Sequence, residues 1–507
     1  MTLPRATVLV ALLAALAAPT TARAGSALVE IRQGGEPLVQ AAGGRSLAPE
    51  LGLWRVPRAA LPSLRRAGIL VRTERERSYV RLGALAVGAE PLQSFEWWRS
   101  IVGADTVAPP GPGKPVTIVD SGLDVTHEEF QSRPNTTVLN RQTLETADED
   151  HGTEVASVVA APVNGLGLVG VYPQAVLRSW DASPFAFITS GSAVQGIIAA
   201  TREGPGVINL SFGGDDPDPV LEQAIVYAFR HGSLVVSSAG NEGLDGNPLS
   251  YPASYPHVLT VAATGQSGTV ASFSSESPYV DLAAPGVDIP VAEPIADDPT
   301  GYISASGTSF SAPMVSGAAA WVWTTRPSLD NTQLFDVLRM SAHDIAPAGY
   351  DRATGFGMLD IPAALTFTPP LPDPGEPNDA IDEVSPNGLF TGGEPAITTA
   401  GHLSATAFAR VDRNEDPHDV YRAFVPPHGT LTAQTSGGTV DLRVYRSSAQ
   451  SLSRKPFAAS TRAGVLPDEV RFKNGFSRGV FVYVEVRPDP QTMRTSYTLR
   501  VTSAARR

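Results

Sequence analysis

Short apolar runs alternate with segments of helical periodicity along the middle of the chain. The runs are rich in β-branched residues and have the length of buried strands. The predicted strands are 116–119, 175–179, 206–210, 234–237 and 258–262. The predicted helices are 151–161, 192–203, 219–231 and 308–325. This alternation predicts an α/β fold with a doubly wound parallel sheet, in which functional groups gather at the carboxyl ends of the strands.

The pattern changes on both sides of this central region, residues 90–368. Residues 369–375 form a proline-rich linker. Beyond it, short alternating segments predict an all-β sandwich over residues 376–507, with strands at 419–424, 441–445, 480–486 and 496–501. Before the central region, residues 25–89 predict a small α+β unit, with a strand at 54–57, a helix at 61–68 and a strand at 71–77.

The first 24 residues have the features of a secretory signal peptide. Arg5 precedes an apolar run at 8–18, and Ala22-Arg23-Ala24 is a small-residue cleavage site. The run is too short to span a membrane, and no later run reaches about 18 residues. We therefore expect an exported, soluble protein, either extracellular or, in a Gram-negative cell, periplasmic or on the outer surface. An uncleaved anchor is the alternative.

Composition and charge narrow the possible partners. The chain has 507 residues, of which 42% are hydrophobic, and no cysteine. Disulfides, thiolate metal sites and a cysteine nucleophile are therefore excluded. The net charge is +5 over residues 25–89, −21 over 90–368 and +1 over 369–507. An acidic central region argues against nucleic acid and anionic membranes as partners.

Three polar residues of the central region are of the types that nucleophilic acyl transfer needs. Asp120 ends the first predicted strand, His151 begins a helix, and Ser309 lies in a Gly-Thr-Ser turn at a helix N-terminus. A serine hydroxyl needs an imidazole to take its proton and a buried carboxylate to orient that imidazole. Asn241, in a turn after the strand at 234–237, can donate its side-chain N–H to an oxyanion beside the backbone N–H of Ser309.

Taken together, these motifs resemble the subtilisin-like serine peptidases over about residues 93–365. The matching segments are Asp120-Ser121-Gly122, His151-Gly152-Thr153, Asn209-Leu210-Ser211-Phe212-Gly213, Ala239-Gly240-Asn241 and Gly307-Thr308-Ser309 with Ala312-Pro313. The resemblance implies a secreted serine endopeptidase with an acyl-enzyme intermediate. Ser309 is then the nucleophile, His151 the general base and acid, and Asp120 its orienting carboxylate.

The resemblance also implies a cleft for peptide substrates. Two segments match those that flank the primary side-chain pocket, and Ser250 matches the pocket floor. The substrate-binding residues implied are Ser211, Phe212, Gly213, Ser238, Ala239, Gly240 and Ser250. An extended peptide would add to these segments as a β-strand. A small floor residue without a buried acid suggests a roomy apolar pocket.

A structural calcium site is a further implication of the family pattern. The glycine-containing loop after the His151 helix resembles the family's calcium loop. The ligands implied are Gln93, Glu129, Asn164 and the carbonyls of Pro162, Leu166 and Leu168. Oxygen ligands of this kind suit Ca²⁺. Glu129 stands where the family usually has an aspartate.

The flanking segments resemble accessory parts of such enzymes. Residues 25–89 are similar to propeptides that act as intramolecular chaperone and inhibitor, and we expect self-cleavage near Ala89-Glu90. Glu376-Pro377-Asn378-Asp379 and the later Asp416 with Asp419-Val420-Tyr421 resemble the bacterial pre-peptidase C-terminal domain, which has no catalytic residues of its own. We expect a monomer.

Two other interpretations are open to the same motifs. A carboxyl serine peptidase shares the Gly-Thr-Ser turn but uses a glutamate in place of histidine, so His151-Gly152-Thr153 argues against it. An inactive peptidase fold that serves as a binding scaffold would have lost catalytic residues, whereas all four positions are filled here.

Overall fold

The computed structural model describes five stretches of the chain. They are 26–74 without 33, 78–81, 93–140, 150–183, and 187–505 without 296, 299, 346, 374, 391, 463 and 465. The predicted signal peptide and the predicted cut at Ala89-Glu90 lie outside them. The chain divides into two units, residues 1–75 and 76–507.

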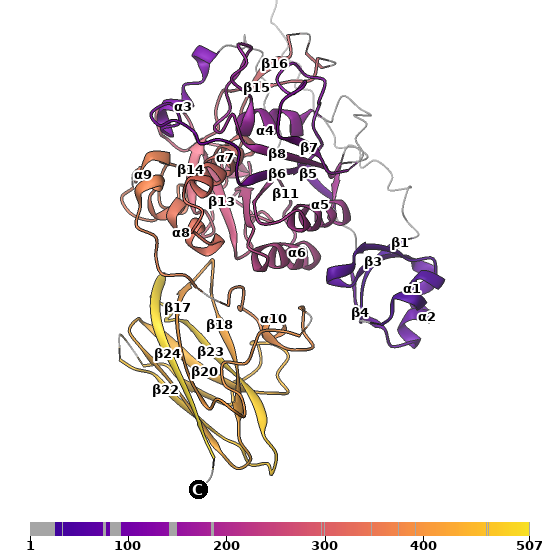
Figure 1. Cartoon of the computed structure of the whole chain (residues 1–507), viewed down its shortest axis with the longest axis vertical. Coiled ribbons are helices and arrows are strands. Elements are labelled where there is room, and N and C mark those ends of the chain that lie inside the picture. Colours follow the sequence, from indigo (N-terminus) through magenta and orange to yellow (C-terminus); the bar gives the residue numbers. More distant parts are fainter. Residues whose placement is uncertain are drawn as a thin grey trace, which may run out of the picture. The chain divides into compact units, whose positions relative to one another are not determined.

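A seven-stranded sheet forms the centre of the larger unit (Figure 1). All of its neighbouring strands are parallel. In spatial order they are β14 (Leu282–Pro285), β13 (Val258–Thr264), β12 (Leu234–Ser238), β10 (Val207–Leu210), β6 (Pro115–Asp120), β8 (Val176–Asp181) and β7 (Thr136–Val138). The predicted α/β fold is confirmed. The edge strands β7 and β14 were not predicted, because one has three residues and the other is largely alanine.

Helices cover both faces of this sheet. α4 (His151–Ala160) and α7 (Thr308–Thr325) pack together on one face, and α5 (Ser190–Arg202) and α6 (Pro219–Arg230) pack together on the other (Figure 1). α7 has the predicted bounds and is buried from Thr308 to Trp323. The further helical segments are η3 (Gln93–Phe95), α3 (Trp98–Ile101), η4 (Gly243–Asp245), α8 (Asn331–Met340), α9 (Ile361–Thr366) and α10 (Ile381–Val384).

Short strands lie beside the carboxyl edge of the sheet. β5 (Ser78–Arg81) pairs antiparallel with both β9 (Ile188–Thr189) and β11 (Phe212–Gly213). β15 (Ile289–Ala292) and β16 (Tyr302–Ala305) form a separate antiparallel pair. A strand from the N-terminal part of the chain therefore lies between two strands of the α/β domain.

Residues 404–504 form the predicted β-sandwich from two antiparallel sheets (Figure 1). One sheet has the order β17 (Ser404–Asp412), β24 (Arg494–Ala504), β19 (Thr430–Ser436) and β22 (Glu469–Lys473). The other has the order β18 (Asp419–Val425), β23 (Val480–Pro488), β20 (Val440–Arg446) and β21 (Ala458–Ser460). Alternate apolar side chains of both sheets form one core.

The smaller unit has a four-stranded antiparallel sheet with two helices. Its strand order is β2 (Arg45–Ala48), β3 (Leu53–Pro57), β1 (Ser26–Ile31) and β4 (Leu70–Glu74). Its helices are α1 (Glu36–Ala41) and α2 (Leu61–Arg66), with the single turns η1 (Pro49–Leu51) and η2 (Arg58–Ala60). This agrees with the small α+β unit that the sequence predicts.

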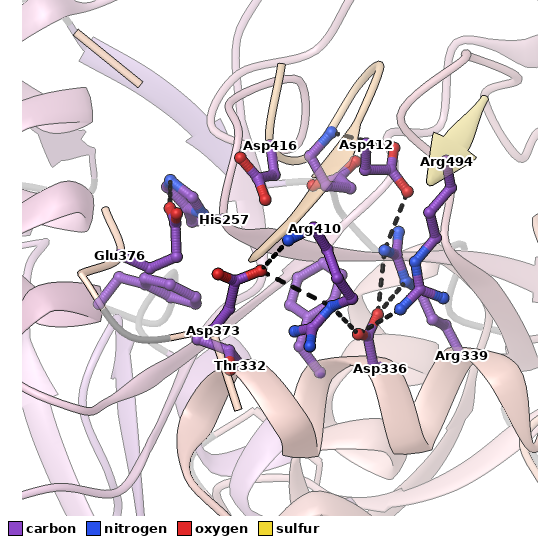
Figure 2. A pocket seen from close by; sticks show the side chains of 13 residues that line it. His257, Thr332, Asp336, Arg339, Asp373, Glu376, Arg410, Asp412, Asp416 and Arg494 are labelled. Carbon is purple, nitrogen blue, oxygen red and sulfur yellow. Dashed lines mark hydrogen bonds and ion pairs between the residues drawn. The ribbon is translucent and has the colours of Figure 1, made fainter. Parts of the chain in front are cut away.

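Charged side chains are buried where the sandwich contacts the α/β domain (Figure 2). Arg339 of α8 is 4% exposed and lies 3.3 Å from Asp281, 3.1 Å from Asp336 and 3.0 Å from Asp412 of β17. Asp336 also pairs with Arg410 and Arg494 of the sandwich. Burial lowers the pKa of Arg339, but the nearby carboxylates outweigh it and raise the pKa above the ordinary arginine value. Arg339 therefore stays charged.

The proline-rich linker takes part in the same contact. The Gln333 side chain donates to the Pro370 carbonyl at 2.8 Å, and the Arg410 N–H donates to Asp373 at 2.7 Å. Asp373 is buried. These linker residues are packed, which differs from the flexible spacer that a proline-rich sequence suggests.

We expect Arg339→Met to lower the free energy of unfolding by about 3–5 kcal/mol, because it leaves buried carboxylates without their counter-charge. Denaturant unfolding at neutral pH measures this change. Arg478→Met, at an exposed arginine of the sandwich, is the control and should stay within about 0.5 kcal/mol of the parent. A loss as small as the control's would mean that the Arg339 cluster is solvated.

Candidate active site

Asp120 and His151 meet at the carboxyl end of β6. The Asp120 carboxylate is buried, and its Oδ1 lies 2.7 Å from the Ser121 N–H and 2.9 Å from His151 Nδ1. A carboxylate can only accept hydrogen bonds, so Nδ1 is the protonated nitrogen of His151. The other ring nitrogen, Nε2, then carries the lone pair that can accept a proton.

The residues that follow Asp120 and His151 fix how closely α4 approaches β6. Ser121 Oγ accepts the Gly152 N–H at 2.9 Å, and Thr153 Oγ1 accepts the Asp124 N–H at 2.8 Å. A Cβ atom at position 152 would lie 2.0 Å from the Gly122 carbonyl oxygen. Glycine is therefore required at position 152 for His151 to reach Asp120.

Ser309 comes to the same place from α7. It is the second residue of that helix and is buried. Its Oγ donates to the Ser211 carbonyl at 3.4 Å, and Ser211 Oγ donates to the Ser309 carbonyl at 3.0 Å. The neighbouring Phe310 packs on His151 with ring centroids 6.0 Å apart. The fold thus brings Asp120, His151 and Ser309 together from three separate elements.

Asn241 lies beside the start of α7 and is held there by Thr308. Its Oδ1 accepts from the Thr308 N–H at 3.0 Å and from Thr308 Oγ1 at 2.9 Å. Because this network occupies the amide oxygen, the amide NH₂ group is left to donate elsewhere. Sequence reasoning did not select Thr308 as a positioning residue, although its place next to Ser309 in the turn was a usable signal.

These groups together can perform acyl transfer. The site offers a hydroxyl at a helix N-terminus, an imidazole that can take its proton, a buried carboxylate, and side-chain and backbone N–H donors for an oxyanion. The helix dipole at the start of α7 favours negative charge at that position.

The predicted substrate-binding residues line two neighbouring segments. Ser211 precedes β11, which is formed by Phe212 and Gly213, while Ser238 ends β12 and is followed by Ala239 and Gly240. Gly214 pairs with Tyr251, which brings Ser250 beside the end of β11. A Cβ atom at position 240 would lie 3.3 Å from the Ser250 Cβ and 2.6 Å from Glu242 Oε2. Glycine at this position therefore keeps the space between the two segments open.

Strand β5 occupies the edge of β11. Arg81 pairs with Phe212, and Val80 pairs with Gly213. Because the pairing is antiparallel, the β5 chain runs toward Ser211, whose carbonyl accepts the Ser309 hydroxyl. An extended peptide on this edge is thus directed at Ser309.

The predicted calcium ligands are bonded to one another. Glu129 Oε1 accepts the Leu168 N–H at 2.7 Å and the Tyr302 hydroxyl at 3.1 Å, and Oε2 accepts from Asn164 at 3.1 Å. Asn164 Oδ1 in turn accepts the Leu166 N–H at 2.8 Å. Burial raises the pKa of Glu129, and these hydrogen bonds partly offset the rise.

The two described side chains of that ligand set do not fit a calcium ion as they are placed. Their oxygens accept hydrogen bonds from N–H donors of the loop and from the Tyr302 hydroxyl of β16. Gln93 begins η3, but its side chain lies outside the described residues. The carbonyls of Pro162, Leu166 and Leu168 would be the remaining donors. The Glu129 carboxylate itself fixes the loop after α4 through its hydrogen bonds with Asn164 and Leu168.

Comparison with known proteins agrees with the fold. Residues 111–357 match the model of the subtilase family. The chain is 34% identical over 255 residues to subtilisin Savinase of Lederbergia lenta, covering 50% of this chain and 91% of the relative. It is 33% identical over 262 residues to subtilisin DY of Bacillus licheniformis, with the same coverage.

Fervidolysin of Fervidobacterium pennivorans shares the fold over most of the chain. The match has a TM-score of 0.59 and 20% identity, and it covers 93% of this chain and 92% of fervidolysin. The chain belongs to the subtilase family and is a serine endopeptidase.

We expect Asn164→Ala to lower the free energy of unfolding by about 1–2 kcal/mol, because it removes a donor from the buried Glu129 carboxylate. The loss should be equal in excess calcium and in excess chelator, as thermal melts of both samples will show. Val163→Ala, at an exposed residue of the same loop, is the matched control. Calcium stabilisation of the parent that Asn164→Ala abolishes would instead place an ion in this loop.

Proposed function

We propose that this subtilase hydrolyses internal peptide bonds through a covalent acyl-enzyme at Ser309. The observation that carries the proposal is the 2.9 Å hydrogen bond from His151 Nδ1 to Asp120, with Phe310, the residue next to Ser309, packed on the His151 ring. His151 Nε2 takes the hydroxyl proton as Ser309 Oγ attacks the peptide carbonyl. The same proton then passes to the leaving amine as the C–N bond breaks.

Water completes the reaction by the reverse sequence. It attacks the ester with loss of a proton to His151, and the ester oxygen leaves as the Ser309 hydroxyl takes that proton back. In both halves the carbonyl oxygen becomes negative. The Asn241 amide and the Ser309 N–H are the donors for this charge, since Thr308 holds the Asn241 oxygen away from it.

Substrate binds as an extended strand along β11, between it and β9. The antiparallel pairing of β5 with these two strands supports this mode of binding. Ala239, Gly240 and Ser250 would form the primary side-chain pocket. All three are small, so we propose a preference for sizeable apolar side chains there.

We expect Ser309→Ala to lower kcat by about 10⁶, as loss of the nucleophile does in a subtilisin. Asn241→Ala should lower kcat by about 10²–10³ with little change in KM, because its donor is needed only when the oxyanion forms. Turnover of a peptide amide substrate by the purified variants measures both. If the Ser309→Ala protein cleaves at the parent rate, the proposed mechanism is wrong.

We further propose export and self-processing. Residues 1–24 act as a signal peptide, and residues 25–89, with net charge +5, act as a propeptide that associates with the −21 enzyme domain. The sequence favours a cut near Ala89-Glu90. The pairing of β5 with β11 and β9 keeps residues 78–81 on the edge proposed for substrate, ahead of that bond.

In the wild type we expect a mature N-terminus near Glu90, found by N-terminal sequencing of a time course. Ser309→Ala should accumulate with residues 25–89 still attached. A mature N-terminus within residues 25–81 would disprove this position of the cut. Trimming of purified Ser309→Ala at the same bond, without another protease, would disprove self-processing.

The sandwich is proposed to be an accessory domain without catalytic groups, as its resemblance to the pre-peptidase C-terminal domain implies. Asp120, His151, Asn241 and Ser309 all precede it. Its buried contacts with Arg339 and Asp336 support a role in stabilising the enzyme domain. Among the described residues, none of the helices has the length and apolar character to cross a membrane.

A further inference from the structure

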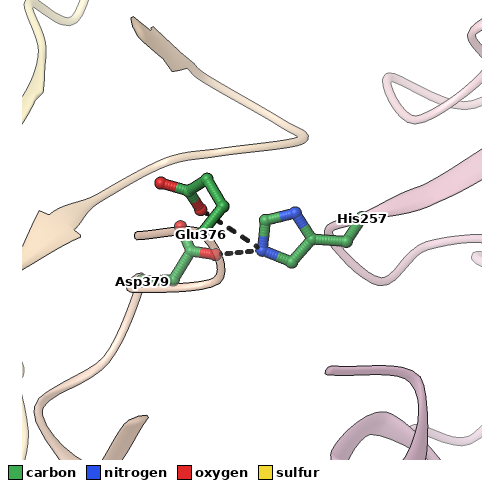
Figure 3. Close-up of side chains that lie close together, drawn as sticks. All are labelled: His257, Glu376 and Asp379. Carbon is green, nitrogen blue, oxygen red and sulfur yellow. Dashed lines mark hydrogen bonds and ion pairs between the residues drawn. The ribbon is translucent and has the colours of Figure 1, made fainter. Parts of the chain in front are cut away.

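A second cluster of titratable side chains lies where the sandwich begins, away from the candidate active site. His257, which precedes β13, faces Glu376 and Asp379 from the segment after the linker (Figure 3). Asp416 and Asp419, next to the start of β18, approach the same Glu376. Glu376 is common to both groups.

The donor atoms of the first group converge on one point. His257 Nε2 lies 2.6 Å from Asp379 Oδ2 and 3.9 Å from Glu376 Oε2. The three atoms are within 4.8 Å of one another. The imidazole stacks on Phe229 with ring centroids 4.3 Å apart, which fixes its direction. The imidazole is therefore held in place by apolar packing with its polar edge toward the carboxylates.

Buried carboxylate oxygens without a hydrogen bond give an independent indication of a bound cation. The Glu376 side chain is 4% exposed, and its Oε2 has no hydrogen bond. Asp419 is 0% exposed, and its Oδ1 has none either. Asp416 lies in one group with these two carboxylates, so three acidic side chains meet there. So many acidic groups in one buried place need added positive charge.

Space is present beside His257 and Glu376. A cavity of about 40 Å³ is lined by His257, Glu376, Asp373 and Asp416 together with residues of the Arg339 cluster (Figure 2). This is enough for an ion with a water molecule. The arginines of that cluster already pair with Asp336, Asp373 and Asp412. No arginine is paired with Glu376 or Asp379 among the described ion pairs.

We propose that His257, Glu376 and Asp379 bind a divalent transition-metal ion of the Zn²⁺ class, which joins the peptidase domain to the sandwich. Ligands about 2.1 Å from such an ion lie about 3.4 Å apart, and the observed separations of 2.6 and 3.9 Å bracket this value. An imidazole with two carboxylates favours Zn²⁺ or Mn²⁺ over Ca²⁺, which takes oxygen ligands.

Such an ion would compensate the carboxylates around Glu376, as Arg339 compensates Asp281, Asp336 and Asp412 elsewhere in the domain junction. It would neutralise buried carboxylates with a charge bonded to residues of both domains. The nearby Asp416 and Asp419 would raise its affinity by their negative charge.

The test measures metal content and stability in full-length protein that carries Ser309→Ala, which prevents self-digestion. Samples stripped with chelator and dialysed are titrated with Zn²⁺, Mn²⁺ and Ca²⁺. The variants are His257→Asn, Glu376→Gln and Asp379→Asn. Asparagine is chosen because His257 has a φ of 63°, which asparagine tolerates. His402→Gln, at an exposed histidine, is the matched control.

The parent and His402→Gln should retain one equivalent of Zn²⁺ and melt at least about 3 °C higher with it than without it. His257→Asn should weaken Zn²⁺ binding by at least about tenfold, and so should Glu376→Gln. The proposal is overturned if the parent binds no ion. It is also overturned if Ca²⁺ alone binds with an affinity that His257→Asn leaves unchanged. Circular dichroism checks that each variant folds. If His257→Asn does not fold, Asp379→Asn replaces it in the comparison of Zn²⁺ binding.

Discussion

The complete burial of α7 is the constraint on which the rest of this structure depends. A helix that is apolar and small-chained on all sides can only lie in the core, and α7 is packed between α4 and the sheet. Ser316, a polar residue within α7, donates to Asn209 of β10 at 2.9 Å and is therefore hydrogen-bonded inside the core. The packing of α7 therefore fixes Ser309, near the start of the helix, at the carboxyl edge of the central sheet. At this edge β6 ends and Asn241 follows β12.

Small polar residues then orient the reactive groups around that position. Thr308 fixes the Asn241 amide, and Ser121 fixes the start of α4 below His151. Each of these hydroxyls bonds a group that would otherwise be buried without a partner, which is expensive in a low-dielectric interior. The same principle acts in the Glu129 loop, where a carboxylate accepts the donors that surround it. Pre-formed bonds of this kind keep the site rigid before substrate arrives.

Buried charged residues characterise the contact between the central domain and the sandwich. The central domain has an excess of acidic residues, and two of them, Asp281 and Asp336, are buried where the sandwich docks. Arg339 compensates Asp281, Asp336 and Asp412 there. Among the described ion pairs, none joins an arginine to Glu376 or Asp379, and the proposed cation is the physical complement of that arrangement. The junction between the domains is consequently as much a charge-compensation site as an apolar contact.

The sequence alone determined the fold class and the chemistry of the active site. Periodicity located the core strands and α7, because buried strands and helices must repeat their apolar residues at fixed spacing. The residue types around Asp120, His151 and Ser309 were sufficient to suggest acyl transfer, because few combinations of side chains can activate a hydroxyl.

Only the tertiary structure decided how distant segments meet. The pairing of β5 with β11 and the approach of His257 to Glu376 join residues more than a hundred positions apart. The packing of the proline-rich linker joins residues 37 positions apart. No local pattern encodes such contacts, because a single histidine or acidic residue has the same sequence signature whether it is solvated or buried. Their partners, and therefore their charge state and function, depend on which surfaces the folded domains bury together.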